Sequence, residues 1–159
     1  MGVPVAAPEI NQIAIVVKDL RKTVEMYHKI LGWGPWNIYL PKPSRRSDLT
    51  LRGKAVHYTV NVAETRVGSV SFEIIEPVEG PSIHREFLEK RGEGLHHIGC
   101  FTTHELDAAL RNFDQMGIGV LMSGKIDGVQ WYYMDTEPIL KLVYETGDEA
   151  APTPDLTYP

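Results

Sequence analysis

An internal duplication constrains the fold of this chain more than any other feature. Apolar, strand-like runs open at Gln12 and at His97, and each leads into a helical segment that ends in a hydrophobic–glycine pair, at residues 31–32 and 116–117. Both pairs of positions are 85 residues apart. A repeat at a fixed offset indicates two equivalent units that pack together. We therefore expect Gln12 and His97 at equivalent strand positions that face one shared site.

Each copy has the pattern of one strand, one helix and three further strands. Residues 12–18, 33–41, 55–63 and 69–76 are predicted strands of the first copy, with a helix at 20–31, and residues 96–102, 118–126, 129–134 and 139–145 are those of the second, with a helix at 104–116. The prediction is an α+β fold in which two paired βαβββ modules form a curved, mixed-sheet cleft with helices outside.

The domain boundaries follow from the same pattern. Residues 1–10 are expected to be a flexible arm and residues 11–146 one domain, with modules at 11–78 and 95–146. A helix at 82–91, capped by Ser82, should link the modules. The basic stretch 42–54 is expected to be a polar loop, and the proline-bearing tail 147–159 to be loose.

Composition narrows the classes of function. Hydrophobic residues make up 43% of the 159 residues and charged residues 23%, which is typical of a soluble globular domain. A net charge of −5 argues against a nucleic-acid partner. A single cysteine fits a reducing, cytoplasmic location. No apolar run is long enough to span a membrane and no signal peptide is evident, so we expect no membrane partner.

The duplication also brings potential ligands together. The first strand of each module supplies Gln12 or His97, and the last strand supplies Glu73 or Glu145. A carboxylate among apolar strand residues is costly unless it is paired, hydrogen-bonded or bound to a metal. One imidazole, one amide oxygen and two carboxylates suit a six-coordinate divalent cation with two open positions. Zn, Co, Ni, Mn and Fe(II) all fit this set, so the sequence predicts one divalent metal ion without choosing among them.

Three stretches have a recognisable pattern: the opening strand 12–20, the segment 72–77 (FEIIEP) and the linker-to-strand segment 82–99. Together they resemble the vicinal oxygen chelate superfamily, which includes glyoxalase I, methylmalonyl-CoA epimerase, extradiol dioxygenases and bleomycin-resistance proteins. The last is most like methylmalonyl-CoA epimerases. The resemblance implies that Gln12, Glu73, His97 and Glu145 fall on the four metal positions.

The resemblance also implies a reaction. We expect a metal-dependent isomerase or lyase that abstracts a proton next to a carbonyl through a metal-stabilised enolate. Glu145 would act as the base, as its position does in the epimerases, and Glu73 would flank the substrate. The epimerases use a second acid outside the metal shell, and His57 is the substitute candidate here.

Some positions depart from the epimerase pattern. Epimerases usually have histidine where this chain has Gln12, whereas some glyoxalase I enzymes have glutamine there. Glyoxalases that use glutathione tend to have arginine and asparagine where this chain has Val16 and Pro77. The alternatives are therefore a glyoxalase I-like lyase and a non-catalytic ligand-binding protein.

The remaining expectations concern the pocket and the partners. Trp36, Tyr39 and Tyr133 are candidates to line an apolar substrate pocket. His96 should point to the opposite strand face from His97, because side chains alternate along a strand. The partner is expected to be a small carbonyl compound, including an acyl-CoA whose phosphates the 42–54 loop could receive. By analogy with the family, we expect a homodimer.

Overall fold

A computed structural model of the chain describes residues 9–101 and 105–159. Its strands form one mixed sheet in the order β11-β2-β5-β6-β1-β7-β10-β9-β8-β3-β4. The strands are β1 (Gln12–Val16), β2 (Trp36–Tyr39), β3 (Arg46–Leu51), β4 (Lys54–Ala55), β5 (Thr59–Val67), β6 (Val70–Glu79), β7 (Gly94–Gly99), β8 (Val120–Ile126), β9 (Val129–Met134), β10 (Val143–Gly147) and β11 (Leu156–Tyr158). The helices are α1 (Leu20–Leu31), α2 (Ile83–Arg91), α3 (Leu106–Gln115) and α4 (Glu137–Leu140), with a 3-10 turn, η1 (Pro43–Arg45).

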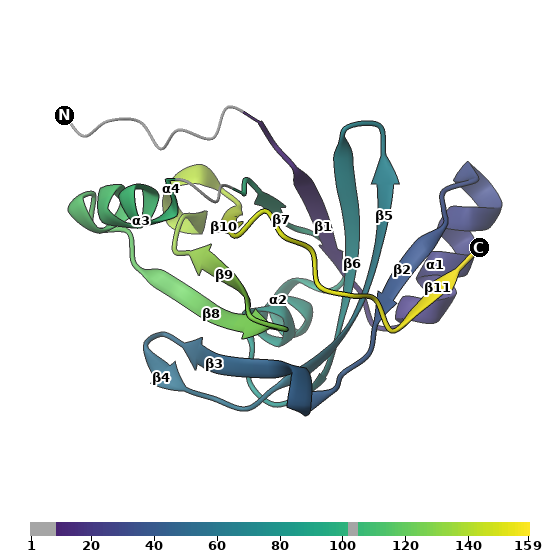
Figure 1. Cartoon of the computed structure of the whole chain (residues 1–159), viewed down its shortest axis with the longest axis horizontal. Helices are drawn as coiled ribbons and strands as arrows, with labels where there is room; N and C mark the ends of the chain where they lie inside the picture. Colours follow the sequence, from purple (N-terminus) through teal and green to yellow (C-terminus); the bar gives the residue numbers. More distant parts are fainter. Residues whose placement is uncertain (1–8, 102–104) are drawn as a thin grey trace.

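The sheet has the internal symmetry that the duplication predicts. The first module contributes β2-β5-β6-β1 and the second contributes β8-β9-β10-β7. In each module the first strand runs parallel to the last, β1 with β6 and β7 with β10. The modules join through the antiparallel pair β1–β7, so the curved sheet forms within one chain. The predicted α+β architecture is confirmed (Figure 1).

The two modules exchange edge strands, which the sequence pattern did not predict. The expected polar loop 42–54 contains β3, which leaves the first module and pairs with β8 of the second. In return the expected loose tail supplies β11, which pairs with β2 of the first. Arg45, next to β3, stabilises both strand exchanges through ion pairs with Asp127 in the β8–β9 turn and Asp155 next to β11. Asp155 also accepts a hydrogen bond from the Leu40 amide and an ion pair from Lys42.

The helices divide between the two faces of the sheet. The helix α1, capped by the Asp19 carboxylate, buries Leu20 and Val24 against the outer face of the first module. On the other module, Phe113 of α3 packs on Tyr144 of β10. In contrast, α2 lies between the two halves (Figure 1), where Ile83 belongs to the core that fills the inner face. The inner face is therefore closed by α2 at one end and left open elsewhere.

No helix in the described part of the chain has the length and apolar character needed to cross a membrane.

Candidate metal centre

The strand register places the four predicted ligands on one face of the sheet. On β1–β6, Ala14 is opposite Glu73, two residues after Gln12. On β7–β10, Gly99 is opposite Glu145, two residues after His97. The central pair β1–β7 completes the symmetry, because Gln12 is opposite Gly99 and His97 is opposite Ala14. Register partners and residues two apart share a face, so all four side chains point toward the inside of the curved sheet.

The functional atoms of these side chains converge. His97 Nε2 lies 3.0 Å from Glu145 Oε2 and 3.4 Å from Glu73 Oε2. The three ligand atoms of Glu73, His97 and Glu145 all lie within 4.8 Å of one another. Gln12 lies on the same face and packs against Gly99, where an added Cβ would lie 2.9 Å from Gln12 Oε1. Glycine at position 99 therefore leaves room for the amide to reach the site.

Buried polar atoms without partners provide the test of whether these residues fit a metal ion. Gln12 Oε1, Glu73 Oε2, His97 Nε2 and Glu145 Oε2 are each buried, and beyond the contacts of His97 Nε2 with the two carboxylates they have no hydrogen-bond partner among the residues described. Buried polar atoms are normally satisfied, so buried ligand atoms that contact only one another indicate a missing partner. One nitrogen and three oxygens form a mixed donor set that suits a divalent transition ion, so the residues fit.

Electrostatics at the site favour a positive charge between the carboxylates. Burial lowers the pKa of His97, but hydrogen bonding and charge from Glu145 and Glu73 outweigh it and raise this pKa to about 9. Burial raises the pKa of Glu73, and the charge of Glu145 adds to that effect. In the metal-free protein, a proton on His97 therefore occupies the place that a cation would take.

The structure corrects the prediction for His96. The register of β1–β7 shifts after Ala14, so that His97 and Leu95 are opposite consecutive β1 residues and His96 is the extra residue of a β-bulge. A bulge breaks the alternation of side chains. His96 is buried, and its Nδ1 lies 2.8 Å from Nδ1 of His97. This contact holds the imidazole of His97 with Nε2 directed at the carboxylates.

A third imidazole stands behind this pair. His84 is buried at the start of α2, with its ring 5.0 Å from that of His96. Burial and the neighbouring His97 lower the pKa of His84 well below its usual value, so it is neutral. The rings of His84, His96, His97 and Tyr133 form one packed cluster, with Tyr133 4.9 Å from His97. This cluster supports the site from the side of α2.

Gln12, Glu73 and Glu145 line a cavity of about 430 Å³. Tyr39 and Tyr133 both line it, as the sequence predicted for substrate-binding residues. The wall of the first module is the even-numbered face of β5, and the wall of the second includes residues of β9. Lining residues from these strands are Val60, Val62, Glu64, Arg66, Val129, Gln130, Trp131 and Tyr133. A volume of this size is enough for a small organic ligand.

Glu64 is a carboxylate in this cavity that the sequence prediction missed. It is opposite Glu73 in the β5–β6 register, so both face inward. The hydroxyl groups of Ser71 and Tyr39 hydrogen-bond to it. Burial raises the pKa of Glu64, and the charge of Glu73 raises it further. The predicted strand ended at residue 63; extending the alternation of Tyr58 and Val60 would have found this residue.

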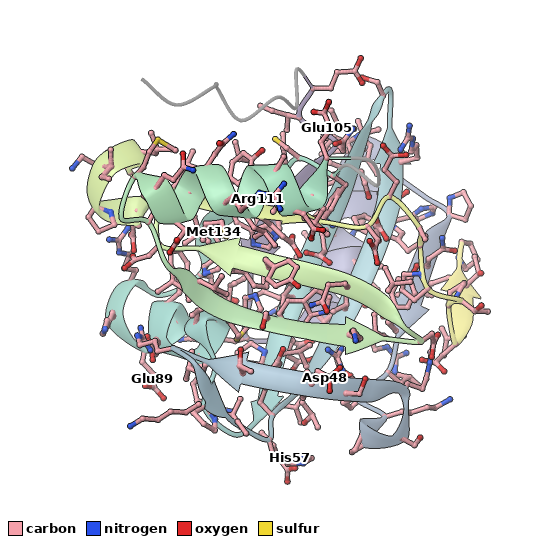
Figure 2. The ribbon with its side chains drawn as sticks, turned by 60° about the vertical axis from the view of Figure 1, so that its left-hand side comes forward. Asp48, His57, Glu89, Glu105, Arg111 and Met134 are labelled. Carbon is pink, nitrogen blue, oxygen red and sulfur yellow. The ribbon has the colours of Figure 1, made fainter. Side chains whose placement is uncertain are left out.

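Two other predicted site residues lie away from the cavity. His57 is exposed and precedes β5; Figure 2 shows it at the lower edge of the molecule, directed outward. The assignment of His57 as a catalytic acid is therefore corrected. Trp36 is fully buried with Ile38 and Ala63 in the core beneath α1. Side chains alternate along β2, so Trp36 and Ile38 face outward into this core, whereas Tyr39 faces inward to the cavity.

Comparison with known proteins identifies the family. The sequence profile of the glyoxalase/bleomycin resistance protein/dioxygenase superfamily matches residues 11–133. The chain therefore belongs to this superfamily. A curated relative, the uncharacterised protein YqjC of Bacillus subtilis (strain 168), is 56% identical over 39 residues, which are 24% of this chain and 28% of that protein.

Solved structures share the fold. Methylmalonyl-CoA epimerase from Mycobacterium tuberculosis superposes with a TM-score of 0.65 at 18% identity, covering 95% of this chain and 94% of that one. A variant of the Streptomyces coelicolor methylmalonyl-CoA epimerase, in complex with 2-nitronate-propionyl-CoA, gives a TM-score of 0.68 at 22% identity, covering 94% of this chain and 100% of that one. These similarities confirm the vicinal oxygen chelate fold.

Proposed function

We propose that this protein is a metal-dependent isomerase or lyase of the epimerase type, which removes a proton from the carbon next to a carbonyl group. The observation that carries the proposal is the buried set of potential ligand atoms on Gln12, Glu73, His97 and Glu145, which have no hydrogen-bond partner among the described residues beyond the contacts of His97 with the two carboxylates. Gln12, Glu73 and Glu145 line a cavity with the volume of a small-molecule site. The epimerase structures that share the fold support an acyl-CoA or a related carbonyl compound as substrate.

Gln12, Glu73, His97 and Glu145 would hold the metal ion, and His96 would orient His97 through the contact between their Nδ1 atoms. Such a cation, when bound, polarises a carbonyl oxygen and stabilises negative charge that develops on it. Its identity is open among Zn, Co, Ni, Mn and Fe(II) on the donor set alone.

The proton transfers are assigned to carboxylates on opposite walls. Glu145 of β10 accepts the proton, and the electron pair of the broken C–H bond moves toward the carbonyl. A second group returns a proton to the same carbon from the other wall, which inverts the centre. Glu73 lies on that wall, and beside it Glu64, outside the ligand set, has the raised pKa of a proton donor. We assign this return to Glu64, in place of His57.

Exchange with solvent tests the proposal directly. Metal-loaded protein is incubated with methylmalonyl-CoA in deuterium oxide, and the deuterium at the carbon between the two carbonyl groups is followed by mass spectrometry. We expect exchange well above the rate without protein, together with equilibration of the two epimers. Absence of both, at full metal content, would remove the epimerase assignment.

A glyoxalase I-like activity is the second candidate, because glutamine at the first ligand position also occurs in some of those enzymes. The hemithioacetal of methylglyoxal and glutathione is its test substrate, and isomerisation of that compound without exchange on methylmalonyl-CoA would favour it. Binding of ligands by a protein that turns over neither compound and holds no metal would favour the non-catalytic members of the superfamily. The homodimer and the cytoplasmic location stay predictions.

A further inference from the structure

Arg46 faces the same cavity as the candidate metal centre. It opens β3, where it is opposite Ile126 of β8, and Ile126 is opposite Val129 of β9. All three residues line the cavity. Because register partners share a face, the Arg46 side chain extends inward from the second module.

The guanidinium of Arg46 is incompletely satisfied. Its Nε is buried and has no hydrogen-bond partner among the described residues. Its side chain hydrogen-bonds to the Tyr58 hydroxyl, but no ion pair in the described part of the chain includes it. The preceding residue differs, since Arg45 forms ion pairs with Asp127 and Asp155. Arg45 therefore holds the fold together, whereas Arg46 lines the cavity without an ion-pair partner among the described residues.

The charges around the cavity suggest what this donor binds. A divalent ion at the proposed centre would balance the carboxylates of Glu73 and Glu145, so neither would be available as a counter-charge for Arg46. Other acidic residues line the cavity at Glu64, Asp148 and Glu149, and none of them pairs with Arg46. A half-buried guanidinium whose Nε lacks a partner can bind an anion, and its planar geometry favours carboxylate.

We propose that Arg46 binds a carboxylate of the substrate and is therefore a specificity-determining residue of this site. This inference rests on the proposed function, because it takes the metal centre as the place where the carbonyl binds. Arg46 then holds the second end of the same small molecule. A phosphate group, such as those of an acyl-CoA, carries the same type of charge, and the experiment distinguishes the two sources.

Binding of malonate tests the proposal without any turnover. Affinities for malonate, for its neutral analogue malonamide and for inorganic phosphate are measured by calorimetry on wild type and on Arg46→Met at equal metal content. We expect Arg46→Met to weaken malonate binding by about tenfold or more, the usual effect of losing a charge-assisted hydrogen bond. Malonamide affinity should stay unchanged. Arg46→Lys, which keeps the charge, should recover part of the lost affinity.

Arg111 supplies the matched control. It is exposed on α3 (Figure 2), and Arg111→Met removes the same charge far from the cavity, so malonate affinity should equal that of wild type. Thermal melting shows whether each variant is folded, and Arg46→Lys serves as the test if Arg46→Met is not. Equal malonate affinity in wild type and the Arg46 variants, or no malonate binding to wild type, would overturn the proposal. A loss confined to phosphate would overturn the carboxylate assignment.

Failure of the proposed function has a different signature. If methylmalonyl-CoA shows no exchange while Arg46→Met still selectively loses malonate, the carboxylate site stands and the epimerase assignment falls. If exchange is present and the Arg46 variants bind malonate as tightly as wild type, the epimerase assignment stands and the carboxylate site at Arg46 falls.

Discussion

Replacing Glu145 with glutamine should reduce deuterium exchange at the substrate carbon by about 1,000-fold, within the range typical of removing a general base. The variant keeps an oxygen atom at the ligand position but loses the group that accepts the proton. Glu145 is buried, with its Oε2 3.0 Å from His97 Nε2. Because glutamine has nearly the same shape as glutamate, the substitution should leave the fold intact. The rate is measured by mass spectrometry on samples of equal metal content.

The matched control for this variant is Glu89→Gln. Glu89 is an exposed residue of α2 that points away from the protein in Figure 2. The same chemical change there should leave exchange at the wild-type rate. Exchange that persists in Glu145→Gln would exclude Glu145 as the base, and Glu64 or Glu73 would become the candidate.

The affinity for the metal ion should rise steeply with pH. The pKa of His97 is raised to about 9 in the metal-free protein, and the metal requires the unprotonated Nε2. Below this pKa each binding event must displace a proton, so affinity should fall about tenfold for each pH unit between about 9 and 6.5. Competition with a chelator, corrected for the chelator's own titration, measures this slope.

The stability of the metal-free protein should change in the opposite direction. A raised folded-state pKa means that the bound proton stabilises the fold below the unfolded value of about 6.5, and that this contribution is lost as pH rises toward 9. The difference in melting temperature between metal-loaded and metal-free protein should therefore widen with pH. His28→Gln, at an exposed histidine of α1, should leave both trends unchanged. A metal affinity that is flat across this range would contradict the assignment of His97 as a ligand.

The duplication made the central features of the site predictable. Equivalent positions on the paired first and last strands indicated that Gln12, Glu73, His97 and Glu145 would meet. The structure places the ligand atoms of Glu73, His97 and Glu145 within 4.8 Å of one another, with Gln12 on the same face of the sheet. In a fold built from two equivalent modules, residues at equivalent sequence positions occupy equivalent places on the paired strands. For that reason the ligand set could be proposed without knowledge of the distances.

Features that break the local pattern were not predictable in the same way. The bulge at His96 is a property of the β1–β7 pairing, so alternation within β7 alone gave the wrong face. The sequence pattern predicts a polar loop around Arg46, because the strand that this residue opens forms only by pairing with β8. Likewise β11 forms only against β2. Each of these depends on a partner strand far away in the sequence.

The central claim is that four side chains from two related modules hold one divalent ion, and metal analysis of the purified protein tests it most directly. After exposure to Zn, Co, Ni, Mn or Fe(II) salts and removal of free ions, elemental mass spectrometry should find about one divalent ion per chain. The His97→Ala variant, folded by its melting curve, should retain none. A wild-type protein that binds no stoichiometric ion, or a His97→Ala variant that binds it as well as wild type, would contradict the account.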